Sequence, residues 1–355
     1  MNILGTSTSP LGAAYQAIAI HTTDPLHAAK ARGLMVGYDR LYRQHDYRVV
    51  GVEDTITAPL VNVDTGRTSR TFQLAGKLDV RLVDADGKTV IMDHKTASDD
   101  IADLDAMYWR QLIVESQPSH YMLLEWLNGR KVDYCVWDVV RKPAIRPAQI
   151  TNAERENLMR TGVYCGYHLT NRDWADYDIL TTESGKHRET PRMHEARLAE
   201  DCTTTRPEWY FKRRRVNRLD IELEEYAREL WQHAEEIRVA TAAGRHPRSS
   251  GSCIRYHQSC RFLGICSGYD HHESPKWRRK PWAHAELPVL DGDGRQYLTN
   301  SRIRDFQSCR RSHQYNYLIG IERDEDRDAL IFGTLWHEAQ AAWWGAFIGG
   351  EDGRA

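Results

Sequence analysis

The stretch "GKLDVRLVDADGKTVIMDHKTA" at residues 76–97 predicts a β-hairpin with a charged site at one end. Its first arm contains Asp79, "DADG" supplies a turn with a glycine, and the second arm begins with the apolar run "TVIM". Asp93 and Lys95 follow directly after that run. A buried strand that delivers charged residues at its end favours a functional site, and an ordinary polar hairpin end is the alternative.

The spacing within the second arm indicates a metal site. Asp93 and Lys95 share one face of a strand because they are two positions apart, whereas His94 points to the other face. Mg²⁺ prefers hard oxygen ligands, and carboxylates on adjacent strands, here Asp79 and Asp93, supply them. Lys95 would then lie beside a metal-bound water, where it can orient the nucleophile or offset charge on an attacked phosphate.

The flanking sequence predicts a mixed α/β fold. We expect helices over residues 12–45 with a break at 23–25, strands at 47–61, 72–83 and 88–95, a helical stretch at 103–129 and a further strand at 131–140. This β-β-β-α-β order is typical of a mixed sheet with one crossover helix. From about residue 150 onward the pattern is helical and polar, with a long helix at 220–244.

Composition limits the classes of protein. The chain of 355 residues is 41% hydrophobic and 28% charged, as in globular proteins. We find no membrane-spanning run and no export signal, so a cytoplasmic protein is the default expectation. The net charge of −2 means that nucleic acid would contact local basic surface, such as residues 211–218 or 276–282, for which a solvated face or loop is the alternative.

The seven cysteines indicate metal or cluster ligation rather than a disulfide framework. Three of them follow a C-x6-C-x5-C spacing at residues 253–266, which differs from the C-x2-C of zinc ribbons. We expect the three cysteines outside this region and residue 309 to be ordinary thiols: Cys135, Cys165 and Cys202.

Two motifs in the first half of the chain resemble those of a nuclease family. "GKLD" and the strand ending "DHK" resemble motifs II and III of the PD-(D/E)XK nuclease superfamily. "SQPSHY" resembles the Q-x-x-x-Y motif of its RecB-like branch. The resemblance implies that Asp79, Asp93 and Lys95 are catalytic with Mg²⁺ or Mn²⁺. It also implies that Gln117 and Tyr121, one helical turn apart, position the metal-site groups and DNA.

The cysteines resemble those of the iron–sulfur, AddB-like members of the same branch. "SRIRDFQSC" resembles the opening segment of that branch and ends in a fourth cysteine. The resemblance implies a structural [4Fe–4S] cluster, since four thiolates suit such a cluster. Zinc is the alternative, with His257 or His271 as a further ligand. The implied cluster ligands are Cys253, Cys260, Cys266 and Cys309.

The segment "GTLWH" at residues 333–337 resembles the first motif of the branch, with His337 as an imidazole ligand of the metal. A packed core histidine is the alternative. In the branch, the cysteine and histidine segments come first, whereas here they come last. A circular permutation, a site shared in trans between chains and a fusion of two incomplete genes each explain this order. Glu53 matches a glutamate that members often carry on the preceding strand.

We therefore expect an α/β protein with a mixed central β-sheet flanked by helices, a restriction-endonuclease-like core with an added helical, cysteine-cluster region. Residues 1–150 would form the core, 151–270 the helical region, 271–298 a linker and 299–355 the permuted segment. The expected function is a DNA exonuclease of recombination, repair or phage DNA processing.

Its partners would be single-stranded DNA or duplex ends, with a homo-oligomer or a recombination protein as further partners and no membrane. A non-catalytic DNA-binding module and a zinc-stabilised adaptor are the alternatives. No Walker A motif is present, so any ATP use would come from another protein.

Overall fold

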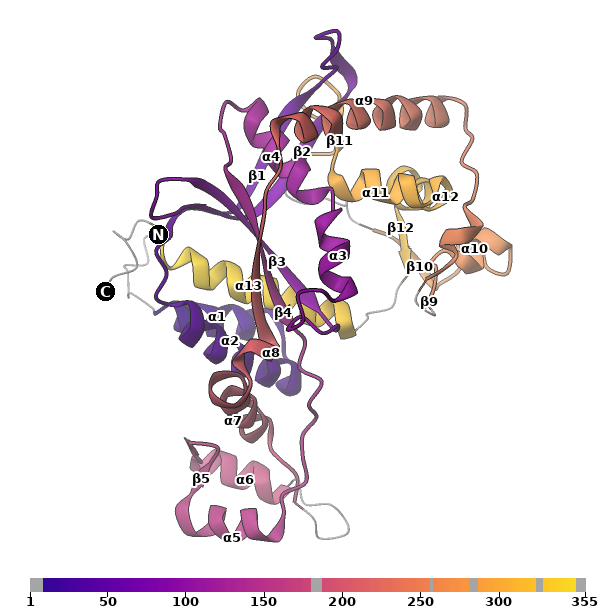
Figure 1. Ribbon diagram of the computed structural model, residues 1–355. Helices are drawn as coiled ribbons and strands as arrows, with labels where there is room; N and C mark the ends of the chain where they lie inside the picture. The colour runs from indigo at the N-terminus through magenta and orange to yellow at the C-terminus, as the bar shows by residue number, and fades with distance from the viewer. Residues whose placement is uncertain (1–8, 180–186, 256–257, 281–286, 324–327, 349–355) are drawn as a thin grey trace, which may run out of the picture.

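A computed structural model describes residues 9–179, 187–255, 258–280, 287–323 and 328–348, and a twisted sheet lies at its centre (Figure 1). Within these ranges the sheet has six strands in the order β1-β2-β3-β4-β7, and β11 pairs with β2. The strands are β1 (Arg48–Val61), β2 (Thr68–Val83), β3 (Thr89–Ala97), β4 (Tyr134–Arg141), β7 (Phe211–Val216) and β11 (Gln296–Leu298).

The sheet is mixed, as the sequence predicts. β1, β2 and β3 are antiparallel neighbours, β3 and β4 are parallel, and β4 and β7 are antiparallel. Parallel strands need a crossover connection, and here it contains α3 (Met107–Ile113) and α4 (Gln117–Leu127). The predicted β-β-β-α-β order is therefore confirmed.

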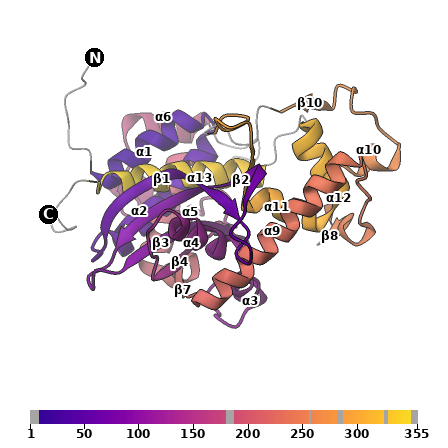
Figure 2. The ribbon, with the colours of Figure 1, turned by 90° about the horizontal axis from the view of Figure 1, so that it is seen from above.

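Helices cover both faces of the sheet (Figures 1 and 2). One core contains side chains of α3, α4, α9 (Asp220–Ala242) and α11 (Asn300–Ser308). The other contains side chains of α1 (Pro10–His21), α2 (Pro25–Tyr42) and α13 (Asp328–Gly345). Along β3, Ile91 and Ala97 pack in the α4 core, whereas Val90 and Met92 pack in the α13 core. This helix–sheet–helix arrangement confirms the predicted fold class.

The two long strands β1 and β2 change faces in their middle. In a regular strand, residues two apart share a face. Leu78 nevertheless packs in the α4 core, while Val80 and Leu82 pack in the α13 core. The alternation therefore breaks at Asp79, and Glu53, which lies opposite in the β1–β2 pairing, has a φ of 56°. As a result, Asp79 lies between the two cores.

A helical segment is inserted between β4 and β7 and projects from the sheet at the bottom of Figure 1. It has a small core of its own, which includes Leu158, Tyr177 and Met193, and α7 packs against α2. Its elements are α5 (Asn152–Thr161), β5 (Val163–Tyr164), β6 (Tyr167–His168), α6 (Asn171–Ile179), α7 (Pro191–Glu200), the π-helix η1 (Asp201–Thr205) and α8 (Pro207–Tyr210).

The cysteine region, which comprises residues 250–255, 258–280 and 309–323, lies beyond α9 and beside α11 (Figures 1 and 2). Phe262, Trp277, Tyr315 and Ile321 form its small core. Its elements are η2 (Ser250–Ser252), β8 (Ile254–Arg255), β9 (Gln258–Ser259), α10 (Leu263–Ser267), β10 (Trp277–Arg279), α12 (Arg310–His313), the π-helix η3 (Gln314–Ile319) and β12 (Ile321–Arg323).

Two stretches differ from their predictions. Residues 211–216 of the basic run form β7, although that run was compatible with a solvated face or a loop. The arginines are tolerated in a strand because each finds a partner: Arg214 donates to the Leu104 carbonyl at 3.2 Å, for example. The predicted linker at 271–298 also contains β10 and β11, and β11 joins the central sheet beside β2.

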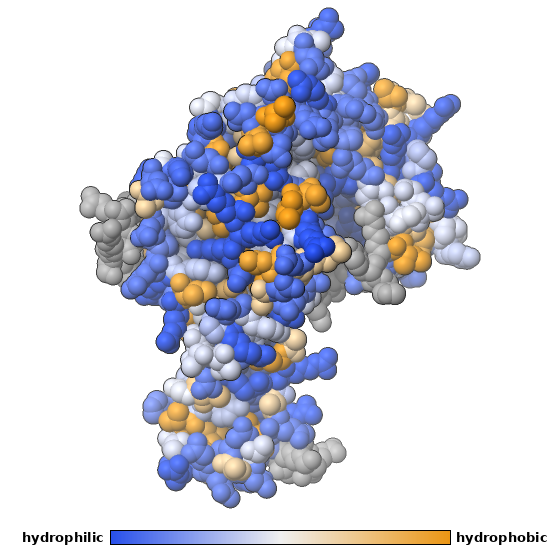
Figure 3. Space-filling model, viewed as in Figure 1, coloured by the Kyte–Doolittle hydropathy of each residue, from blue (hydrophilic) through white to orange (hydrophobic). Residues whose placement is uncertain are grey.

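The visible surface is mostly hydrophilic, with apolar side chains scattered among polar ones (Figure 3). Among the described residues, no helix is both long enough and apolar enough to span a membrane.

A buried ionic network joins β4 to four other elements. Asp138 accepts hydrogen bonds from Arg213 at 2.9 Å, from Gln340 at 3.3 Å and from Tyr38, and its Oδ2 lies 3.0 Å from His94 Nδ1. Burial alone would raise the pKa of Asp138. The Arg213 guanidinium and the hydrogen bond with His94 instead hold that pKa well below its usual range. Asp138 is therefore ionised, and its charge is compensated by Arg213.

Replacing Asp138 with Ala should lower the free energy of unfolding by about 3–5 kcal/mol, because Arg213 would remain buried without its carboxylate. Urea titration followed by circular dichroism measures this loss. Asp86→Ala, in the exposed turn of the β2–β3 hairpin, is the matched control and should change stability by less than about 0.5 kcal/mol. Equal stability of the two variants would contradict the role assigned to Asp138.

Candidate active site

The two aspartates of the hairpin lie where β2 and β3 stop pairing. The pairing reaches from Val83–Thr89 to Val80–Met92, and Asp79 and Asp93 are the next residues. Beyond this point the side chain of Asp79 takes the place of a ladder partner, because its Oδ2 accepts a hydrogen bond from the main-chain N–H of His94 at 2.7 Å. Both carboxylates are therefore fixed at the opening between the strands.

Lys95 and the helix residue Gln117 surround Asp93. Gln117 Nε2 donates to Asp93 Oδ1 at 2.9 Å and to the Tyr121 hydroxyl at 2.7 Å, and Lys95 Nζ donates to Gln117 Oε1 at 2.9 Å. Lys95 also forms an ion pair with Asp93. The ring of Tyr121 passes close to Gly76, where a Cβ atom would meet it at 3.1 Å, so Gly76 leaves room for this residue.

His337 approaches the site from the opposite side of the sheet. Its Nδ1 lies 3.8 Å from Asp79 Oδ2, and Gly333, one turn earlier on α13, lies beside Thr96 of β3. Asp79 reaches both His337 and the Asp93 side because β2 changes faces at this residue. One chain therefore brings together all six predicted site residues: Asp79, Asp93, Lys95, Gln117, Tyr121 and His337.

Glu53 lies on the neighbouring strand and forms an ion pair with Lys77. Its positive φ is uncommon for a residue other than glycine, and such conformations concentrate at functional sites. The negative charge of Glu53 also acts on the His337 ring. Glu53 therefore belongs to the rim of the site.

The electrostatics of the site favour a bound cation. Burial, together with the negative charge of Asp93, raises the pKa of Asp79 to about 7. Burial lowers the pKa of His337, which keeps its imidazole neutral and able to act as a ligand. A divalent cation would relieve the repulsion between the two carboxylates.

The side chains of Asp79, Asp93 and His337 are chemically suitable ligands for Mg²⁺ or Mn²⁺, but they are not arranged around a common metal position. Two carboxylates and one imidazole are suitable ligands for these ions. Within the part of the chain that the structure describes, however, no group of three or more His, Cys, Asp or Glu side chains is placed to hold a metal ion. The carboxylate of Asp93 forms an ion pair with Lys95, and the carboxylate of Asp79 accepts a hydrogen bond from the main-chain N–H of His94. A metal ion at this carboxylate of Asp93 would compete with Lys95.

The four cysteines predicted as cluster ligands lie in one region but do not form a finished site either. Cys309 Sγ accepts a hydrogen bond from the Ser249 N–H at 3.4 Å, and Cys253 Sγ donates to the carbonyl of the same serine at 3.6 Å. Cys260 and Cys266 pack on the Phe262 core. All are free thiols, and no metal-holding group of three occurs among the described residues.

The alternative zinc ligands and the other thiols lie elsewhere. His257 is outside the described residues, and His271 is largely exposed and lies near Glu273. Cys135 and Cys202 are buried thiols, and Cys165 is partly buried in the inserted segment.

Sequence reasoning missed Asp138 and Arg213, which support the site through His94. The side chain of His94 is held by Asp138, and its main-chain N–H holds Asp79. The available signal was the single charged residue within the apolar run "YCVWDVV", since a carboxylate in a buried strand needs a partner.

Comparison with known proteins identifies the class of protein to which this site belongs. The family model of the PD-(D/E)XK nuclease superfamily matches residues 13–267, and the chain belongs to this superfamily. Members hydrolyse phosphodiester bonds, usually with Mg²⁺ or Mn²⁺. The matched segment includes the hairpin and α4, whereas Cys309 and His337 lie after it. Neither the curated proteins nor the solved structures gave a match.

Asp79→Asn should stabilise the metal-free protein at pH 8 by roughly 2–4 kcal/mol. The pKa of Asp79 is about 7 in the folded protein, well above its usual value in an unfolded chain. The folded state therefore loses stability as the pH rises from that usual pKa to about 7. Asparagine carries no charge and still accepts the His94 N–H. The gain should shrink as the pH falls toward 4, where Asp79 is protonated.

Urea titrations at pH 5 and pH 8 in EDTA measure this difference, with Asp86→Asn as the exposed control. Added Mn²⁺ should stabilise the wild type and have little effect on Asp79→Asn. Destabilisation of Asp79→Asn to the same extent at both pH values would refute the electrostatic interpretation.

Proposed function

We propose that the protein is a metal-dependent DNA exonuclease with a structural iron–sulfur cluster. The observation that carries the nuclease site is the convergence of His337 with Asp79, Asp93 and Lys95 within one chain. Two carboxylates that repel each other beside a lysine are costly to keep in a site without catalytic activity. The proposal therefore favours catalysis over a non-catalytic DNA-binding module.

His337, Asp79 and Asp93 would hold the metal, with a main-chain carbonyl near His94. A bound Mg²⁺ or Mn²⁺ supplies an activated water and polarises the phosphoryl oxygen. Lys95, once released from Asp93, donates a hydrogen bond to the attacking water or to the phosphate and offsets its developing charge.

Neighbouring side chains set the position of this lysine. Gln117 holds the ammonium group through its side-chain oxygen, and the ring of Trp137 lies 5.0 Å from Lys95 Nζ. Tyr121 in turn fixes the amide of Gln117.

The substrate strand would approach past α11. A cavity of about 220 Å³ lies beside Gln117 and Tyr121, and Lys77, Ser301 and Arg304 also line it. Cations and hydrogen-bond donors of this kind suit a phosphate backbone. The basic run 211–218 contributes less than its charge suggests, since its arginines are engaged within the protein. Single strands fit a small cavity better than duplex does.

The cluster proposal rests on the gathering of Cys253, Cys260, Cys266 and Cys309 between α10 and α12. A cluster there would join the loop at residues 253–266 to the segment that precedes α12. Aromatic packing of Tyr315 on Phe262 supports the same junction, with ring centroids 5.4 Å apart. A zinc-stabilised adaptor is the second reading of these thiols.

We also infer that the motif order reflects a circular permutation. α1 packs along α13, and His21 lies 3.7 Å from Glu338, next to His337. The helix with the first motif therefore adjoins the helix that leads into the sheet, as it would if one followed the other in the chain. The approach of His337 to Asp79 within one chain supports a permutation over a site shared in trans.

Asp93→Ala should reduce Mn²⁺-dependent cleavage of end-labelled single-stranded DNA by at least about a thousandfold, since a metal ligand is lost. DNA binding in EDTA should change by less than about twofold. Asp86→Ala in the same hairpin should cleave like the wild type. Retained cleavage by Asp93→Ala would remove the site assignment, and failure of the wild type to cleave would favour a binding module.

Cys260→Ala should remove the brown colour of anaerobically purified protein and its iron and sulfide, and should lower its thermal stability. Cys165→Ala, in the inserted segment, is the control and should keep the colour, the iron and sulfide content and the thermal stability of the wild type. Metal analysis and visible absorbance measure the outcome. A colourless, iron-free and fully stable wild type would overturn the cluster, and stoichiometric zinc would support the adaptor reading.

A further inference from the structure

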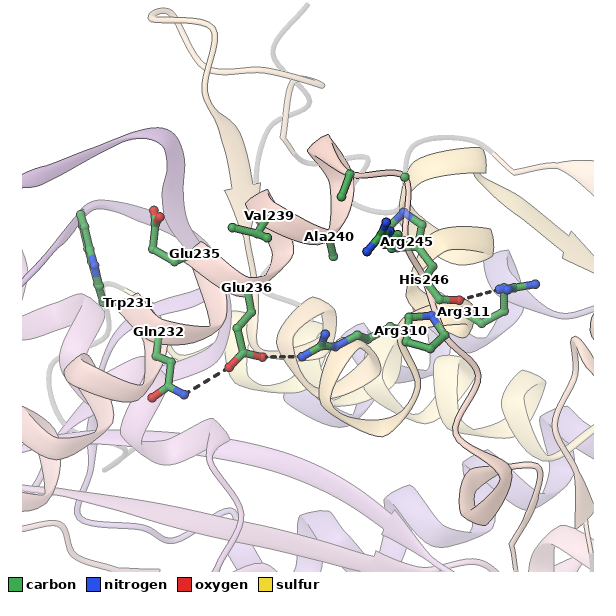
Figure 4. Close-up of a pocket in the computed structure, with 13 residues that line it drawn as sticks. Trp231, Gln232, Glu235, Glu236, Val239, Ala240, Arg245, His246, Arg310 and Arg311 are labelled. Carbon is green, nitrogen blue, oxygen red and sulfur yellow. Dashed lines mark hydrogen bonds and ion pairs between the residues drawn. The ribbon is translucent and has the colours of Figure 1, made fainter.

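A groove with a volume of about 1120 Å³ lies between the second half of α9 and the start of α12 (Figure 4). Its α9 side is largely apolar and is lined by Trp231, Val239, Ala240 and Ala243. Trp231, Val239 and Ala243 lie on one face of the helix, because they are eight and four residues apart. Val239 is 56% exposed, although its neighbours Ile237 and Ala240 are buried in the core. The apolar stripe of α9 therefore extends beyond what the core covers.

The charges in this groove are unequally distributed. Figure 4 shows Glu235 beside Trp231 at one end, and Arg245 with Arg311 at the other. The groove is lined by two carboxylates, those of Glu235 and Glu236, and both are neutralised by arginines. Glu235 pairs with Arg238 at 2.7 Å, and Glu236 pairs with Arg310 at 2.9 Å.

The two arginines at the other end lack such partners. Arg311 donates to the His246 carbonyl at 2.7 Å. Among the residues that the structure describes, no carboxylate lies within ion-pair distance of Arg245 or Arg311. One end of the groove therefore carries uncompensated positive charge.

A buried polar atom adds a second indication. His246 lines the groove and is only 6% exposed, yet its Nδ1 has no hydrogen-bond partner among the described residues. Buried polar groups are normally satisfied, so this nitrogen still has a hydrogen bond to form, either with water or with an occupant of the groove.

We propose that this groove binds a short peptide segment of a partner protein, with apolar side chains followed by acidic ones. The apolar side chains would cover Trp231 and Val239, and the carboxylates would lie opposite Arg245 and Arg311. Truncated apolar anchors and reversed charges at such a site each weaken binding.

The same features disfavour a nucleic-acid strand in this groove. A phosphodiester backbone carries negative charge along its whole length, whereas the groove carries uncompensated positive charge at one end only. The apolar floor offers few hydrogen-bond donors to phosphate. An occupant with negative charge at one end only is the better match. This inference does not depend on the nuclease activity.

The probe is a fluorescein-labelled hexapeptide of sequence Gly-Leu-Phe-Asp-Glu-Asp with a free carboxyl terminus. Its fluorescence anisotropy is followed on addition of the full chain in EDTA, where no cleavage occurs. We expect a Kd on the order of 10 μM for the wild type. Arg245→Glu and Val239→Asp should each weaken binding at least about tenfold, and both positions are exposed, so the fold should be retained.

Arg155→Glu, an equal charge reversal on exposed α5, is the matched control and should bind like the wild type. Absence of binding up to about 100 μM wild-type protein would overturn the proposal, as would equal binding by all variants. An oligothymidylate of fifteen nucleotides serves as competitor. If it displaces the peptide and itself loses affinity in Arg245→Glu, the groove is a nucleic-acid path and the peptide proposal is wrong.

Discussion

The ion pair between Asp138 and Arg213 is the interaction on which the rest of the structure depends. It joins β4 to the edge strand β7, and its further hydrogen-bond partners come from α2, β3 and α13. A buried charge pair of this kind contributes little net free energy compared with apolar packing, but removing one partner is costly. Its expected role is a constraint on register, because β7 and α13 dock with their polar groups against Asp138.

His94 transmits this constraint to the candidate active site. Its ring is held on the α13 side of β3 by Asp138, and its main-chain N–H holds Asp79 at the opening between the strands. Lys95 and Asp93, on the other face, are arranged by Gln117. The site thus has one half supported by the buried network of Asp138 and another half arranged by Gln117 and Lys95.

Local sequence patterns predicted the hairpin, the crossover helices and the mixed sheet, because each depends on neighbouring residues. The same is true of Asp79, Asp93 and Lys95 as candidate ligands and catalyst. β7 was missed because "FKRRRV" reads as polar until Arg213 meets Asp138, a residue 75 positions away. The change of face at Asp79 was not predictable, since it depends on the backbone of Glu53 in a different strand. β11 has only three residues and is defined by its partner β2.

The position of His337 in the chain has a consequence for when the candidate site is assembled during synthesis. The hairpin with Asp79 and Asp93 lies in the first part of the polypeptide, but the imidazole that faces Asp79 is carried by α13, more than two hundred residues later. Contacts between such distant segments form late in folding, and domains begin to fold before synthesis ends. A partly synthesised or truncated chain would then hold its hairpin without its histidine. The candidate site is therefore complete only once α13 has docked on the sheet.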